Sequence, residues 1–160
     1  MGMIGCYVAL DEKEINQLAS AEIKLEDLDP YDREKLDIDK SWEAIHYMLC
    51  GDISDGEPPF GYIVPLGNDN YLEFAEFGAF YLKPEQVAEG YQAIKPLTRS
   101  DCLALYNFEA MLKDEVYPLF SGDEESGDQF FDYIFSYLEQ IRNYFEKAVA
   151  AGQGIVFYIF

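Results

Sequence analysis

Three side chains that could carry chemistry lie close together in one stretch of the sequence. Asp39, Glu43 and His46 are spaced at i, i+4 and i+7, so a helix would project all three from one side. Glu43 to His46 also forms an E-x-x-H pattern, which carboxylate-bridged di-iron bundles use in two copies. The chain has one histidine, which excludes a dinuclear site of that type. A mononuclear site of Asp, Glu and His stays open as an interpretation.

The same stretch also has a structural interpretation. We expect Asp39 to cap a helix that ends near residue 51, with Glu43 in solvent. His46 then lies at the edge of the apolar helix face and bonds a nearby backbone or carboxylate group. Trp42 is a core anchor whose indole N–H needs one acceptor. The apolar positions that share one helix face are Ile38, Trp42, Ile45 and Leu49.

The alternative interpretation is a binding or catalytic pocket around His46. Two facts decide between the alternatives: whether His46 opens into a polar cleft, and whether the acidic side chains converge on it. The candidate lining residues of this pocket are Asp37, Asp39, Trp42, Glu43 and His46.

Covalent catalysis by serine or cysteine would have to use His46, and no G-x-S-x-G motif surrounds any serine. Cys50 lies near a predicted helix C-terminus, where the helix dipole disfavours a thiolate, and Cys6 and Cys102 are predicted core residues. The sequence has neither a Walker loop nor a G-x-G-x-x-G motif. We therefore predict no catalytic residue, no metal and no cofactor.

A second candidate site is a row of aromatic side chains on the predicted last helix. Phe130, Tyr133, Tyr137 and Tyr144 follow at i, i+3, i+7 and i+14, beside the buried face of that helix. One interpretation is that another segment packs over the row, with residues 73–81 as the candidate. The other is an exposed surface that binds a partner, because tyrosine gives a large contact area at low entropic cost.

Apolar runs at the two ends of the chain predict buried strands at residues 3–10 and 155–160. Strands that are apolar on both faces belong in the middle of a covered sheet. Capping boxes at Asp11 and Thr98, and a proline at position 84, mark helix starts. The other expected elements are strands at 62–64 and 78–82, and helices beginning near residues 11, 39, 84, 98 and 128.

We therefore expect one domain over residues 1–160, of the α+β class. Its small central sheet has the N- and C-terminal strands as neighbours and is surrounded by about five helices.

The chain is strongly acidic, with 31 Asp and Glu against 11 Lys and Arg and a net charge of −20. An apolar share of 49% indicates a folded protein, so the charge belongs to its surface. Such a field repels phosphates and anionic lipids, and we expect no nucleic-acid or membrane binding. The acidic residues concentrate in three predicted connections, at 26–32, 52–57 and 123–128.

Two segments resemble the YfbM-like family of small bacterial proteins: the opening Met1 to Gly5 and the stretch from Leu36 to Tyr47. The stretch from Tyr81 to Val87 and the closing helix and strand resemble it more loosely. The resemblance implies an α+β fold and a bacterial, cytoplasmic origin. It implies no activity and no catalytic residues.

We expect a non-enzymatic module that captures a basic protein through acidic loops and tyrosines, for example an immunity protein that neutralises a toxin. The alternative is a small enzyme or ligand-binding protein with a pocket beside Trp42 and His46. Three widely spaced cysteines suit a reducing compartment, and no segment has the apolar length of a membrane span. The expected location is the cytoplasm, and the expected state is a monomer or a weak homodimer.

Overall fold

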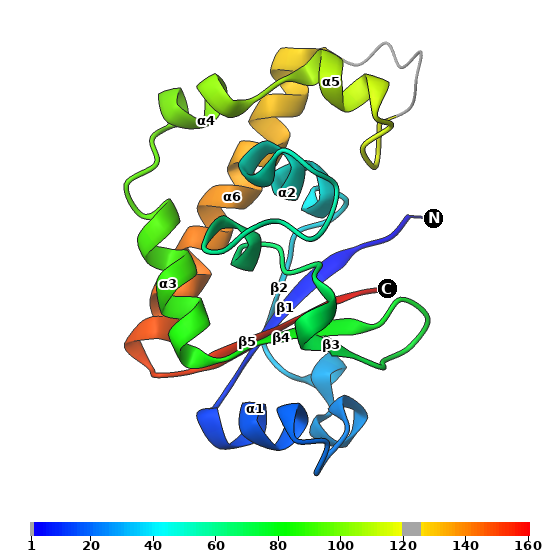
Figure 1. The fold of residues 1–160 in the computed structure, drawn as a ribbon, viewed down its shortest axis with the longest axis vertical. Helices are drawn as coiled ribbons and strands as arrows, with labels where there is room; N and C mark the ends of the chain where they lie inside the picture. Colours follow the sequence, from blue (N-terminus) through cyan, green and yellow to red (C-terminus); the bar gives the residue numbers. More distant parts are fainter. Residues whose placement is uncertain (1, 120–125) are drawn as a thin grey trace.

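The computed structural model describes residues 2–119 and 126–160. These residues form one antiparallel sheet in the order β2-β1-β5-β4-β3, with helices on both of its faces (Figure 1). The strands are β1 (Gly5–Leu10), β2 (Lys35–Asp37), β3 (Tyr71–Leu72), β4 (Ala79–Leu82) and β5 (Gly154–Ile159). The α-helices are α1 (Glu12–Ala19), α2 (Trp42–Cys50), α3 (Pro84–Ile94), α4 (Arg99–Leu105), α5 (Phe108–Lys113) and α6 (Gly127–Ala150).

The two terminal strands are neighbours at the centre of the sheet. β1 and β5 pair antiparallel from Gly5 with Ile159 to Leu10 with Gly154, which confirms the expected α+β fold. Both strands are buried along almost their whole length, as their apolar runs predict.

Side chains that alternate along β1 and β5 point to two different layers. Tyr7 and Phe157 face the larger core, which α2, α3 and α6 cover, and Cys6 and Tyr158 face a smaller core beneath α1. Figure 1 shows α1 and the short helical turns that follow it on one side of the sheet, and α2 to α6 on the opposite side. The chemistry-bearing residues of α2 therefore belong to the thicker layer.

Local signals in the sequence mark several helix boundaries correctly. Asp11 forms a capping box with Glu14 at the start of α1, and Thr98 does the same with Asp101 at the start of α4. Pro84 lies in the first turn of α3. The long helix α6 ends before Gly152, whose φ of 65° suits glycine.

Other expectations are wrong. Residues 62–64 do not form a strand, because the chain turns through a 3-10 helix at Phe60–Tyr62. The helical region that begins at residue 98 is divided into α4 and α5. The short strands β2 and β3 have no alternating pattern long enough to predict them. The acidic residues 123–125 lie outside the described part of the chain.

No helix in residues 2–119 and 126–160 is long and apolar enough to cross a membrane.

Candidate functional site

His46 is sealed inside the protein, with 1% of its surface exposed. Its Nδ1 donates to the carbonyl oxygen of Val64 at 2.9 Å, and its Nε2 accepts from the backbone N–H of Gly56 at 3.2 Å. These partners fix the neutral Nδ1–H tautomer, since a carbonyl only accepts and an N–H only donates. Burial lowers the pKa of His46, which favours the same neutral form. Both ring nitrogens are therefore used by the fold.

Trp42 and Glu43, at the start of α2, also have partners within the protein. The indole N–H of Trp42 donates to the carbonyl oxygen of Met3 at 3.0 Å, and its ring packs on Tyr117. Glu43 is half-buried and accepts from the backbone N–H of Tyr117 at 3.3 Å. Burial raises the pKa of Glu43. Glu43 is thus not a solvated surface residue, contrary to expectation.

Asp39 is not the cap of α2, which begins after Ser41. The backbone of Asp39 has a φ of 52°, a left-handed conformation that aspartate tolerates better than most residues. Its carboxylate accepts from the hydroxyl of Tyr133 at 2.6 Å, and its N–H donates to the carboxylate of Asp37 at 2.7 Å. These bonds hold the connection from β2 to α2 against α6.

Asp37 and Asp39 are linked in this way, but Asp39, Glu43 and His46 point to different partners and do not converge. Within the described residues, no group of three or more His, Cys, Asp or Glu side chains could hold a metal ion. The thiols do not supply a nucleophile either. Burial raises the pKa of Cys6 and of Cys50 to about 11 and also raises that of Cys102.

The aromatic row of α6 mostly packs inside the protein. Phe130 is buried, while Tyr133, Tyr137 and Tyr144 are half-buried. The hydroxyl of Tyr144 accepts from the N–H of Ala9 at 2.9 Å, and the hydroxyl of Tyr133 accepts from the N–H of Lys40 at 3.1 Å. The covering segments are therefore β1 and the β2–α2 connection.

The segment 73–81 does not cover the row. Its Phe74 and Tyr81 belong to the smaller core on the α1 side of the sheet, and only Phe80 faces the larger core.

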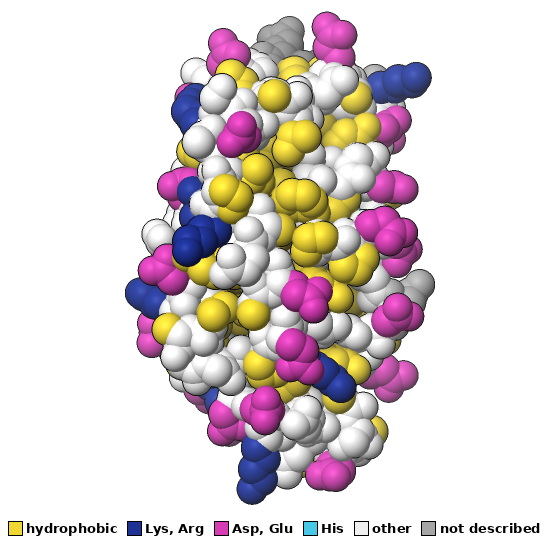
Figure 2. Space-filling view, turned by 60° about the vertical axis from the view of Figure 1, so that its left-hand side comes forward, with side chains coloured by type: hydrophobic (Ala, Val, Ile, Leu, Met, Phe, Trp, Pro, Cys, Tyr) yellow, Lys and Arg dark blue, Asp and Glu magenta, His cyan; other side chains and the backbone are white. Residues whose placement is uncertain are grey.

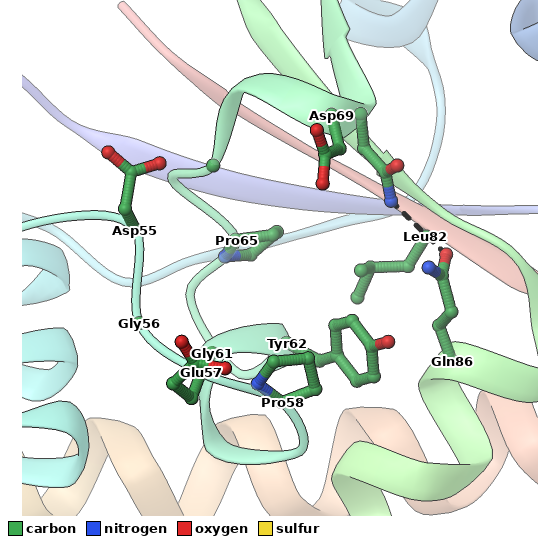
Figure 3. Close-up of a pocket in the computed structure, with 12 residues that line it drawn as sticks. Asp55, Gly56, Glu57, Pro58, Gly61, Tyr62, Pro65, Asp69, Leu82 and Gln86 are labelled. Carbon is green, nitrogen blue, oxygen red and sulfur yellow. Dashed lines mark hydrogen bonds between the residues drawn. The ribbon is translucent and has the colours of Figure 1, made fainter.

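The described surface has a polar cavity of about 460 Å³. Gly56, whose N–H donates to His46, lines this cavity, and His46 itself does not. We call it the acidic cleft and define it by Asp55, Glu57, Tyr62, Asp69, Asn70 and Gln86. Its walls come from the α2–α3 connection and from the first turn of α3 (Figure 3). None of the five predicted pocket residues lines it.

Amide groups stiffen one wall of the acidic cleft. Asn70 donates to the carbonyl oxygen of Tyr81 at 2.8 Å and to Oε1 of Gln86 at 3.2 Å. The same oxygen of Gln86 accepts from the N–H of Lys83 at 2.9 Å, at the start of α3. This wall is therefore fixed to the sheet and to a helix end.

Three carboxylates give the cleft its charge. Asp55 and Asp69 stand on different sides of the pocket, and Glu57 lies near Gly61 (Figure 3). None of the three forms an ion pair or a side-chain hydrogen bond within the described residues. No Lys, Arg or His lines the cavity. The arrangement suits a ligand group that is cationic and donates hydrogen bonds.

Only one wall of this site carries a signal in the sequence. The acidic concentration at 52–57 is visible in the sequence, but Asp69, Asn70 and Gln86 come from segments without a shared motif. Only the turn of the chain through residues 60–70 brings them to the same cavity.

Comparison with known proteins gives consistent matches over nearly the whole chain. Residues 1–158 match the family model "Domain of unknown function (DUF1877)". Protein YfbM of Escherichia coli (strain K12) is 26% identical over 162 residues, which cover 95% of each chain. A crystal structure of YfbM from Escherichia coli, described as a protein of unknown function, has a TM-score of 0.77. It is 22% identical and covers 98% of this chain and 99% of its own, so it supports the fold. With the family model spanning almost every residue, the chain belongs to the DUF1877, or YfbM-like, family.

Proposed function

We propose that this protein is a binding module that captures a positively charged partner protein and that the acidic cleft receives a cationic side chain of that partner. The single observation that carries the proposal is the absence of any counter-charge around Asp55, Glu57 and Asp69 in the described cleft. A lysine ammonium or an arginine guanidinium supplies both the missing charge and the hydrogen-bond donors.

The charge of the whole protein supports this proposal. A net charge of −20 accelerates the encounter with a basic protein and makes binding sensitive to salt. The net charge attracts any basic protein, and the acidic cleft then binds a cationic side chain at one defined place. The proposed setting is the bacterial cytoplasm, which suits the free thiols of Cys6, Cys50 and Cys102.

The aromatic row of α6 is a weaker candidate for the partner surface than the cleft. The hydroxyls of Tyr133 and Tyr144 are already used by backbone groups and by Asp39, and Phe130 is 1% exposed. Their hydrogen-bonding groups and apolar surface are therefore already used within the protein and are not available to a partner.

The test uses an oligo-arginine peptide and two variants that lose the same charge. Asp55→Asn/Glu57→Gln/Asp69→Asn neutralises the cleft, whereas Glu22→Gln/Glu34→Gln/Glu109→Gln neutralises three exposed acids elsewhere. Affinities are measured by fluorescence anisotropy at low and high salt. We expect the cleft variant to bind at least about tenfold more weakly than the control variant.

Equal losses of affinity in the two variants would refute the proposal, because the attraction would then be a property of the bulk charge. A small organic cation that binds the cleft as tightly as the peptide would instead favour a ligand-binding protein.

A further inference from the structure

A shallow apolar groove lies directly beside the acidic cleft. Its lining residues are Pro58, Pro59, Ala88, Glu89, Gln92 and Ala93, from the α2–α3 connection and from α3. Pro58 lines both the groove and the cleft, so the two surfaces are continuous. The groove has a volume of about 590 Å³.

The face of the molecule around the groove is unusually apolar for such an acidic protein. Figure 2 shows hydrophobic side chains in a band down the face that bears α3 and α4, with charged side chains at its borders. On α4, Leu103 and Leu105 are 51% and 47% exposed. Contiguous apolar surface with a polar rim is typical of a protein interaction site.

Charge complementarity restricts what can occupy the groove. The charged lining residue is Glu89, and the adjoining cleft adds Asp55, Glu57 and Asp69. An occupant that carried acidic groups would be repelled, and a second copy of this chain would bring a net charge of −20 to the contact. A basic segment meets neither penalty.

We propose that the cleft and the groove together recognise an extended segment of a basic partner in which an apolar residue adjoins a lysine or arginine. The cationic side chain enters the acidic cleft, and the apolar side chain packs on Pro58, Ala88 and Ala93. This inference rests on the proposed function and adds to it a preference for the amino-acid sequence of the bound segment. Charge alone would not distinguish one basic segment from another.

The test compares two peptides on the full-length protein. In one peptide arginine alternates with leucine, and in the other serine replaces each leucine, so that the charge is the same. We expect the leucine peptide to bind about tenfold more tightly, as partial burial of one leucine side chain predicts.

A matched pair of variants tests whether the groove causes the tighter binding of the leucine peptide. Ala88→Gln/Ala93→Gln makes the groove polar without changing charge, and Ala19→Gln/Ala150→Gln makes the same change on α1 and α6. Glutamine is a good helix former, so all four helical sites accept it. The preference for the leucine peptide should disappear in the first variant and persist in the second.

Equal binding of the two peptides to the unchanged protein, or a leucine preference that survives in the groove variant, would overturn the inference and leave the cleft proposal intact. Sedimentation that shows a dimer of the unchanged protein and a monomer of the groove variant would also overturn it, since a second copy would then cover the groove. If the cleft variant and its charge-matched control bind the serine peptide equally, the proposed function itself fails.

Discussion

Gly56 belongs to two regions that differ in how their polar groups are satisfied: it bonds His46, and it lines the acidic cleft. In the first region, both ring nitrogens of His46 are hydrogen-bonded to the backbone and the side chain is sealed. In the second, Asp55, Glu57 and Asp69 line a cavity and have no counter-charge within the described residues. Histidine often does chemistry in proteins, but His46 is structural here. Three surface carboxylates form the candidate site instead.

The comparison shows what separates a functional polar group from a structural one. A buried polar group must be paired, because an unpaired one costs about 1–3 kcal/mol. Groups that the fold has already paired are not free to bind a ligand. A solvated carboxylate can stay unpaired at little cost and remains available.

The largest expected effect is that of replacing His46. His46→Ala should lower the free energy of unfolding by about 3 kcal/mol, because it leaves the carbonyl of Val64 and the N–H of Gly56 without partners and opens a cavity. Urea denaturation measures this loss, with the exposed substitution Asn143→Ala, away from the cleft and the groove, as the control. If His46→Ala were as stable as the unchanged protein but no longer bound the peptide, His46 would be a binding residue and not a structural one.

A smaller loss is expected at the boundary between the two regions. A Cβ atom at Gly61 would overlap the backbone carbonyl oxygen of Gly56, which side-chain movement cannot relieve. Gly61→Ala should therefore destabilise the protein by about 2 kcal/mol. Gly67→Ala is the matched control in the same cleft, since its Cβ would meet only Asp55 at 3.7 Å. Thermal or urea unfolding of both variants measures the difference.

If both glycine variants are as stable as the unchanged protein, the fold does not require the close approach of the backbone at residues 56 and 61.

A still smaller effect is expected on the aromatic row. Tyr133→Phe removes the bonds to Asp39 and Lys40 and should cost about 1 kcal/mol in urea unfolding. Tyr137→Phe should cost almost nothing, because the Tyr137 hydroxyl has no hydrogen bond within the described residues. Equal costs for the two variants would mean that the Asp39 contact does not anchor the β2–α2 connection.

Long, regular patterns in the sequence predict the framework of this fold. The apolar runs at both ends identify the paired strands β1 and β5, and the spacing of Phe131, Ile134, Leu138 and Ile141 identifies the buried face of α6. Local capping signals place the starts of α1 and α4, because they depend only on residues three apart.

The site is not predictable in the same way, because it depends on long-range contacts. The hydroxyl of Tyr133 donates to the carboxylate of Asp39, which is 94 positions away in the sequence, and α2 begins only at Trp42. The acidic cleft needs the turn through residues 60–70 to bring Asp69 beside Asp55. Neither contact leaves a periodic signal.

The free energy of unfolding of Asp55→Asn/Glu57→Gln/Asp69→Asn tests the central claim most directly. If these carboxylates are unpaired and kept for a cationic ligand, neutralising them relieves repulsion, and the variant should be as stable as the unchanged protein or more stable by about 0.5 kcal/mol. Urea denaturation at low salt makes the measurement. A loss of more than about 1 kcal/mol would contradict the claim, since it would mean that the cleft carboxylates, like His46, stabilise the fold.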